Sequence, residues 1–462
     1  MLLYSIYLIQ VELMLTLTTT QLAAILGLTE PKLSVSCEGV SIDTRTLQPG
    51  NLFIAITGSR VDGHEFLQTA YEKDASAAIV SHPVDVPILQ LVVDDTIDAL
   101  GKIGAAWRDQ FNIPILAVTG SNGKTTLKNM MASILRAACQ NDHEVLATQG
   151  NFNNHLGLPL TLPRLNAQHK YAVIEMGMNH FGEIAYLTKL TRPQVAVITN
   201  AAAAHLEGVG DVAGVARAKA EIFQGLAENG IGVINRDDAF YPFWREQIGK
   251  QGYLTFGFHP DADINAKFEE ATNAQSILIH TPQGSMNVNL PLLGRHNVLN
   301  ALAATAATLA TGIPLTAIKQ GLENAHPAPG RLQLHTLANG VNVIDDTYNA
   351  NPFSLQAAVD TLATFAGKKI LVLGDMRELG DEAPMLHQQA GERIRDAGID
   401  FLFTYGDLSE KASQAFGKNA FHFAEQEKLI TALQPLLHNT TTILVKGSRS
   451  MQMEKVIAGL VQ

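Results

Sequence analysis

The sequence predicts an α/β protein of three domains: a small N-terminal α/β domain, a central domain with a parallel sheet, and a C-terminal Rossmann-like α/β domain. Three observations support this fold class. The chain has 462 residues, more than one hydrophobic core usually organises. Short apolar runs alternate with segments of helical periodicity, as expected of crossover units in a parallel sheet. The same alternation starts again in the last third of the chain, which predicts a second large sheet.

The predicted domain boundaries follow changes in this pattern. Residues 15–110 form the first domain, residues 111–328 the second and residues 329–462 the third. Ahead of them, residues 1–14 are apolar enough to suggest a membrane segment. About 20 apolar residues are needed to cross a bilayer, and Glu12 interrupts this run, so we expect an N-terminal extension and no membrane span.

The first domain has short elements. Residues 52–56 and 77–80 are apolar runs of strand length, and residues 96–107 carry apolar side chains at helical spacing. Thr19 or Thr20 is the expected N-cap of an early helix, because a threonine hydroxyl can accept the unpaired N–H groups there.

The other two domains contain longer apolar runs. In the second, residues 113–118 precede a glycine-rich turn and a helical segment, and "YAVIEM" and "QVAVITN" predict further strands. In the third, "KKILVLGDM", "IDFLFTYG" and "TTILVKG" predict strands of a second sheet.

Composition excludes several functional classes. The net charge of −11 argues against a nucleic-acid-binding protein, which usually has a basic face. Cys37 and Cys139 are the only cysteines and stand far apart, so neither a disulfide framework nor a zinc site is predicted. A reducing cytoplasm is the expected location.

The glycine-rich turn "AVTGSNGKTT" predicts a phosphate site. Its spacing is shorter than the usual G-x-x-x-x-G-K-[ST], but a strand precedes it and a helix follows. Backbone N–H groups of such a turn bind phosphate oxygens. Lys124 would contact the outer phosphates, and the hydroxyl of Thr125 or Thr126 would bind Mg²⁺. The expected nucleotide-binding residues are Gly120, Ser121, Asn122, Gly123, Lys124, Thr125 and Thr126. A solvated glycine turn is the alternative.

Two further candidates follow predicted strands. Glu175 ends "YAVIEM", and His205 follows "QVAVITN", at the edge where ligands of open α/β sheets bind. A carboxylate and an imidazole there can bind metal, although a solvated acid and a structural histidine remain alternatives. Lys219, in "GVARAKAEIF", taken alone reads as a solvated helix residue.

These segments together resemble the Mur ligases, the ATP-dependent amide-forming enzymes of peptidoglycan synthesis. The resemblance covers nearly the whole chain from about residue 15 and explains the short glycine loop. It is carried by "SIDTRTLQPGNLFIAITGSRVDGHEF", "TGSNGKTT", "TQGNFNNHLGLPLTL", "VIEMGMNHFGEI", "TNAAAAHLEGVG", "ARAKAEIF", "GRHNVLNALAA", "PGRL", "DDTYNANPFS", "LGDMRELG" and "VKGSR".

The resemblance is greatest to the member that adds D-alanyl-D-alanine. It implies a cytoplasmic, monomeric enzyme that joins this dipeptide to the tripeptide carboxylate of UDP-N-acetylmuramoyl-tripeptide. An acyl phosphate would be the intermediate, and ADP and phosphate would be released. ATP and two Mg²⁺ ions are the implied cofactors, and the third residue of the acceptor, diaminopimelate or lysine, stays open.

The resemblance also assigns roles to residues. Lys124, Lys219, His205 and Arg331 are the implied catalytic residues. Mg²⁺ would be bound by Thr125, Glu175, His205 and Lys219, the last as a carbamate. ATP would be bound further by Asn297 and Asn300 near the base, Arg331 at the γ-phosphate and Asp346 at the ribose. The implied substrate-binding residues are Thr44, Arg45, Asn151, Asn153, Asn154, Asn349 and Lys446. Spacing alone leaves open whether the asparagines instead form local turns.

Two rival functions remain at this point. The segment "NRDD" at 235–238 is one conservative change from a guanine-reading N-K-x-D, which suggests a GTP-binding switch. That hypothesis gives no role to the third domain. Within the enzyme class, the alternatives are another Mur ligase or a related folylpolyglutamate synthase.

Overall fold

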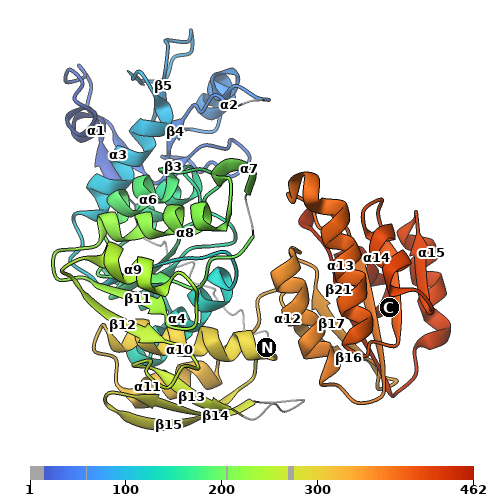
Figure 1. Ribbon diagram of the computed structural model, residues 1–462. Coiled ribbons are helices and arrows are strands. Elements are labelled where there is room, and N and C mark those ends of the chain that lie inside the picture. The colour runs from blue at the N-terminus through green and yellow to red at the C-terminus, as the bar shows by residue number, and fades with distance from the viewer. Residues whose placement is uncertain (1–14, 59, 204–205, 269–274, 462) are drawn as a thin grey trace, which may run out of the picture.

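The computed structural model describes residues 15–58, 60–203, 206–268 and 275–461. Figure 1 shows an N-terminal part in blue, a central part in cyan to yellow and a C-terminal part in orange and red at one side of the others. Each part contains its own mainly parallel sheet. The α/β fold class with three domains is therefore confirmed. The predicted extension over residues 1–14 lies outside the described residues.

The N-terminal sheet is small and parallel. Its strands, in order, are β3 (Val40–Ser41), β4 (Leu52–Ile54), β5 (Ala77–Val80) and β6 (Gln90–Val92), and β1 (Thr16–Thr18) pairs separately with β2 (Ser36–Glu38). The helices are α1 (Thr19–Leu26), α2 (Leu67–Glu72) and α3 (Thr96–Arg108). The expected N-cap of α1 was wrong by one residue, because Thr18 caps it in a reciprocal box with Gln21.

The central sheet is parallel throughout, in the order β12-β11-β10-β7-β9-β8. Its strands are buried because helices cover both faces. They are β7 (Ile115–Thr119), β8 (Val145–Ala147), β9 (Tyr171–Glu175), β10 (Val195–Ile198), β11 (Ile231–Asn235) and β12 (Gly252–Phe256). From β7 the chain runs to the edge strand β8, comes back to β9 beside β7, and then crosses β7 to β10. The direction of winding therefore reverses between β7 and β10. Ligands of open α/β sheets bind at such a point.

Two layers of helices enclose this sheet. On one face, α4 (Lys124–Cys139) packs against α10 (Arg295–Leu309) and α11 (Leu315–Glu323). A small antiparallel sheet of β13 (Asn265–Phe268), β14 (Gln275–Thr281) and β15 (Gly284–Leu290) contacts α10 and α11. The other face carries α5 (Gly157–Thr161), α6 (Glu183–Thr191), α7 (Leu206–Val209), α8 (Val212–Ala220) and α9 (Tyr241–Ile248).

The first two domains share one hydrophobic core. Residues of α1 and α3 belong to the same buried cluster as one face of the central sheet. Trp107 of α3 donates its indole N–H to the Leu165 carbonyl at 2.9 Å, and Arg108 donates to the Thr191 carbonyl at 2.7 Å. The first two domains are therefore packed together as one unit.

The C-terminal sheet has the order β16-β17-β21-β18-β19-β20, with only β16 antiparallel among the described strands. Its strands are β16 (Gln333–Thr336), β17 (Asn342–Asp346), β18 (Lys368–Gly374), β19 (Phe401–Tyr405), β20 (Ala420–Phe423) and β21 (Thr441–Lys446). Its helices are α12 (Pro352–Ala363), α13 (Ala383–Asp396), α14 (Ser409–Phe416), α15 (Gln426–Leu433) and α16 (Glu454–Val461). Separate apolar clusters cover the two faces.

Across the described parts of the chain, we find no helix with the length and hydropathy that crossing a membrane requires.

Candidate active site

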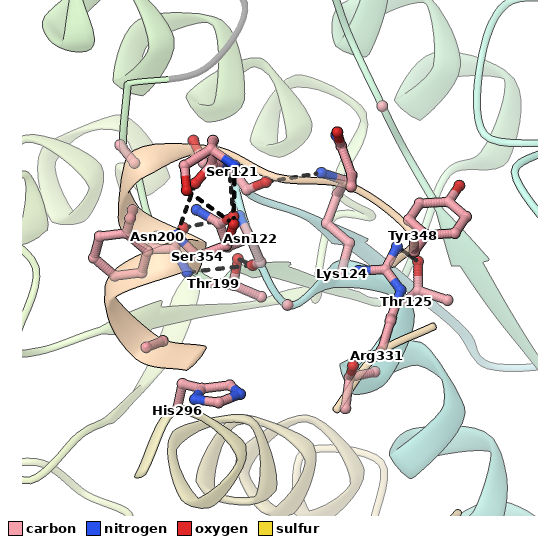
Figure 2. A pocket seen from close by; sticks show the side chains of 18 of the residues that line it. Ser121, Asn122, Lys124, Thr125, Thr199, Asn200, His296, Arg331, Tyr348 and Ser354 are labelled. Atoms are coloured by element: carbon pink, nitrogen blue, oxygen red, sulfur yellow. Dashed lines mark hydrogen bonds between the residues drawn. The ribbon is translucent and has the colours of Figure 1, made fainter. Parts of the chain in front are cut away.

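A cavity of about 950 Å³ lies where the central and C-terminal domains meet. The central domain lines it with the loops that follow β7, β9 and β10 and with the start of α10. The C-terminal domain adds residues 330–332 and 377–379, eight residues between 346 and 357, and Lys446 and Arg449. Figure 2 shows part of this lining. The cavity coincides with the reversal point of the central sheet.

The glycine loop forms the floor on the central side. α4 starts at Lys124, directly after Gly123, which has a left-handed φ of +84°. Asn122 donates its backbone N–H to the Asn200 side chain at 3.0 Å, and Thr199 donates its hydroxyl to the Asn122 carbonyl at 2.6 Å. These bonds, drawn in Figure 2, hold the loop after β7 to the loop after β10. The α4 N-terminus therefore presents its free N–H groups to the cavity.

Lys124 lies within this loop. Its Nζ donates to the Gly120 carbonyl at 2.6 Å and to the Ser121 carbonyl at 3.3 Å. Burial lowers the pKa of Lys124, and the nearby Glu175 carboxylate opposes that effect. The ammonium is thus held at the mouth of the α4 N-terminus, where phosphate oxygens would bind.

Glu175 supplies an unpaired carboxylate oxygen. The residue ends β9 and is 2% exposed. Its Oε1 accepts from the Thr125 hydroxyl at 3.2 Å and from the Asn153 amide at 2.8 Å. Its Oε2 is buried with no hydrogen-bond partner among the described residues, and the Lys128 ammonium is 3.9 Å away. A buried oxygen without a donor fits a cation ligand, since leaving it unpaired is costly.

Lys219 is buried, so the interpretation from sequence alone that it is a solvated helix residue is wrong. It lies on α8, is 2% exposed, and lines the cavity. Burial, and then the charge of Lys124, lower its pKa well below the ordinary lysine value. The amine is therefore more easily deprotonated than a surface lysine.

The described residues contain no metal site built only from His, Cys, Asp and Glu side chains. Within the described ranges, no group of three His, Cys, Asp or Glu residues could hold a metal ion. Thr125, Glu175 and Lys219 all line the cavity, whereas His205 lies outside the described residues.

Arg331 reaches this region from the C-terminal domain. Its guanidinium donates to the Thr125 hydroxyl at 3.2 Å across 206 residues of sequence, and it lies 4.2 Å from the centre of the Tyr348 ring. Figure 2 shows Arg331 and Tyr348 beside Thr125. A second link joins the Asn351 amide to the Asn122 side chain at 3.0 Å. A cation of the third domain thus lies at the phosphate loop of the second.

Asp346 and Lys446 form a buried pair at the ends of neighbouring strands. The Lys446 ammonium donates to Asp346 Oδ2 at 2.6 Å and to the Asn349 carbonyl at 2.9 Å. Burial raises the pKa of Asp346, and the charge of Lys446 opposes the increase. All three residues line the cavity.

Asn297 and Asn300 lie on the first turns of α10. The Asn300 amide donates to Asn297 Oδ1 at 3.1 Å, and the Asn297 amide donates to the Leu293 carbonyl at 2.7 Å. Both are buried and line the cavity beside the glycine loop. The Asn300 side chain lies close to Gly123, which directly precedes α4.

The structure does not bring every sequence candidate to this cavity. Asn151, Asn153 and Asn154 line it, and Asn154 also caps the turn leading into α5 through the Gly157 N–H. Thr44 and Arg45 do not line it. They lie between β3 and β4 of the N-terminal domain, where the Arg45 side chain is 88% exposed and pairs with Asp43.

Several cavity residues were missed from the sequence. His296 is partly buried at the start of α10, and desolvation lowers its pKa to about 4. Thr199 and Asn200 tie down the glycine loop, and Arg377 lines the C-terminal side. Thr199 and Asn200 follow β10, and Arg377 follows β18. The strand-end rule that identified Glu175 could therefore have found these three residues, but not His296.

Gly123 offers a test of the loop geometry. An added Cβ would lie 2.6 Å from Asn300 Oδ1, whereas one at Gly182 would meet nothing within 4 Å, although φ is +86° there and Gly182 also precedes a helix. Both Gly→Ala variants should lose about 1–3 kcal/mol from the positive φ. Only Gly123→Ala should also weaken nucleotide binding, measured by the nucleotide-induced rise in melting temperature. An equal nucleotide-induced rise in melting temperature in both variants would contradict the close approach of Asn300 to Gly123.

Comparison with known proteins gives consistent matches along the chain. The model "Mur ligase family, catalytic domain" matches residues 36–136, the Mur ligase middle domain matches residues 118–308, and "Mur ligase, glutamate ligase domain" matches residues 330–449. The chain is 45% identical to the UDP-N-acetylmuramoyl-tripeptide--D-alanyl-D-alanine ligase of Escherichia coli (strain K12), over 97% of this chain and 99% of that one.

Solved structures of MurF proteins are also similar to this chain. A crystal structure of MurF from Acinetobacter baumannii has a TM-score of 0.91 and 37% identity, covering 97% of this chain and 99% of that one. MurF ligase from Thermotoga maritima in complex with ADP has a TM-score of 0.81 and 27% identity, covering 91% and 96%. The family matches, the identities over almost the full length and the shared fold lead to one conclusion: the chain belongs to the Mur ligase family.

Proposed function

We propose that the protein is an ATP-dependent ligase that joins D-alanyl-D-alanine to the tripeptide carboxylate of UDP-N-acetylmuramoyl-tripeptide. The near-complete alignment with a ligase of that name, at 45% identity, is the observation that carries the proposal. The cavity supports it, since it combines a phosphate loop with an arginine from a second domain.

The reaction needs an activated carboxylate, because a free carboxylate is a poor acyl donor. The acceptor carboxylate attacks the γ-phosphate of ATP, giving an acyl phosphate and ADP. The dipeptide amine then attacks the acyl carbon, and phosphate leaves. Lys124, which precedes Thr125 in the chain, and Arg331, which donates to the Thr125 hydroxyl, would stabilise the transferring phosphoryl group. Asn297 and Asn300 would contact the base, and Asp346 the ribose.

Mg²⁺ fits the unpaired Oε2 of Glu175. Thr125, Glu175, His205 and a carbamylated Lys219 would hold two ions, which neutralise phosphate charge when bound. The buried, neutral-prone amine of Lys219 supports carbamylation, since carbamates form from a neutral amine and CO₂. Glu175 is kept in place for this role by its bonds to Thr125 and Asn153.

The substrate residues and domain boundaries belong to the same proposal. Asn151, Asn153, Asn154, Asn349 and Lys446 would contact the peptide part of the acceptor, and Thr44 and Arg45 its uridine diphosphate. Boundaries near residues 110 and 328 agree with the separate sheets. Because both domains of the cavity come from one chain, we further propose a monomer, acting in the cytoplasm.

The contacts of the NRDD segment disfavour a GTP-binding switch. Asp237 accepts backbone N–H groups of Phe258 and His259, at 2.7 and 2.9 Å. Asp238 accepts the N–H groups of Ala201 and Phe240, at 3.0 and 2.9 Å. These carboxylates already bind the protein's own backbone, which leaves them poorly available to read a guanine.

A phosphate-release assay tests the proposed reaction. ATP should support release only when UDP-N-acetylmuramoyl-tripeptide and D-alanyl-D-alanine are both present, because the acyl phosphate forms only on a bound acceptor. GTP should not replace ATP. Tripeptides ending in diaminopimelate and in lysine should be compared to identify the acceptor. Steady release without either peptide would count against a ligase.

A further inference from the structure

Arg377 is a cavity residue without a role in the proposed reaction. It follows β18, on the loop that forms the C-terminal wall of the cavity. Its side chain is about half exposed, at 49%. The question is which anion this guanidinium faces.

A buried carboxylate holds Arg377 in place. Asp375 is fully buried, and its Oδ1 accepts the N–H groups of Leu408 and Ser409 at 3.1 and 2.8 Å, which fixes it at the start of α14. Its Oδ2 lies 3.0 Å from the Arg377 guanidinium. The Arg377 Nη2 of this contact also donates to Met451 Sδ at 3.9 Å, and since a guanidinium has five N–H donors, others remain for the cavity.

The backbone around Arg377 is also fixed. Its N–H donates to the Ser448 hydroxyl at 2.8 Å, and the Met376 N–H donates to His387 Nε2 at 2.9 Å. Glu378 has a left-handed φ of +63°, which is unfavourable for a residue other than glycine. Strained residues persist where surrounding contacts hold them, often at ligand sites. The backbone that carries Arg377 is therefore held by contacts with Ser448 and His387.

The cavity cations of the phosphate loop and of the rest of the C-terminal domain have other contacts. Lys124 and Arg331 lie at the phosphate loop, and Lys446 is paired with a buried aspartate. Arg449 is 65% exposed and pairs with the partly buried Glu454 at 3.0 Å. Arg377 is the cation of the C-terminal wall that combines a buried support with access to the cavity.

We propose that Arg377 binds the C-terminal carboxylate of the incoming dipeptide, an inference that rests on the proposed ligase function. The dipeptide amine reacts at the phosphate loop, whereas its carboxylate is unchanged by the reaction. An extended dipeptide spans roughly 7 Å, so the carboxylate needs a separate site. A planar guanidinium suits it, because it can form two parallel bonds to a carboxylate.

The test compares D-alanyl-D-alanine with its C-terminal amide, which lacks the charge. The wild type should prefer the acid by about 10²-fold in kcat/KM. In Arg377→Met, the KM for the dipeptide should rise about 10- to 100-fold, the preference should fall to near one, and the KM values for ATP and the tripeptide should stay within about 2-fold. Arg377→Lys should keep part of the preference. Arg395→Met, which removes another half-exposed, ion-paired arginine of this domain, should behave as wild type.

Each other outcome overturns the inference. An unchanged acid preference in Arg377→Met would do so. A higher KM for the tripeptide alone would assign Arg377 to an acceptor carboxylate instead. If Arg377→Met has a lowered melting temperature, Arg377→Lys becomes the deciding variant. A wild-type preference for the acid and a wild-type KM for the dipeptide in Arg377→Lys would contradict the two-bond contact. A wild-type chain without turnover on either peptide would overturn the proposed function itself, and the inference with it.

Discussion

Lys124→Ala is expected to lower ligation turnover by about 10³-fold, because it removes a positive charge next to the transferring phosphoryl group. The side chain is held at the start of α4 by the carbonyls of Gly120 and Ser121. The measurement is kcat for phosphate release at saturating ATP and both peptides.

The control for this variant is Lys319→Ala. Lys319 is a half-exposed lysine of α11, paired with Glu323 at 3.8 Å, and its loss should leave turnover unchanged. Lys124→Ala should keep a cooperative melting transition, since the deleted ammonium is desolvated in the wild type. Near-normal turnover in Lys124→Ala would remove the phosphate-loop assignment.

Lys219→Ala is expected to abolish most activity while the protein stays folded. If Lys219 is carbamylated, the variant loses an anionic metal ligand. The wild-type residue buries an amine whose pKa is already lowered by desolvation, so its removal should cost little stability beyond the small cavity. Turnover at saturating ATP and Mg²⁺ gives the size of the loss, and short carboxylic acids added to the variant should restore part of it.

A direct observation separates the carbamate from a structural lysine. With ¹³C-labelled bicarbonate, the wild type should give a carbamate ¹³C NMR signal that Lys219→Ala lacks. Arg217→Ala is the matched control, because Arg217 lies on the same helix α8 and is 55% exposed. It should change stability by no more than about 0.5 kcal/mol and leave the rate alone. Wild-type turnover in Lys219→Ala would contradict the carbamate.

The glycine loop could be predicted because its information is local. A buried strand, two glycines and an amphipathic helix follow one another within residues 115–139, and each obeys short-range rules of periodicity and backbone freedom. The same holds for Glu175, since a strand end in a parallel sheet points to the ligand edge wherever the strand lies. The α/β class followed from repetition of these local patterns.

The remaining site residues depended on packing between distant segments. Lys219 reads as a surface residue on its own helix, and only the packing of α8 on the central sheet buries it. Arg331 meets Thr125 because the third domain docks on the second, and no local pattern encodes a contact over 206 residues. Asp375 and Arg377 gain their relation to α14 in the same way.

The sequence by itself therefore determined the α/β class, the phosphate loop and the strand-end carboxylate, because these depend on residues within one or two turns or strands of each other. Only the tertiary structure decided which polar groups share the cavity: it joined Arg331 to Thr125, buried Lys219, and left Arg45 exposed in the N-terminal domain. The physical reason is that burial and charge proximity depend on strand order and domain packing, which sum many weak contacts far apart in the chain.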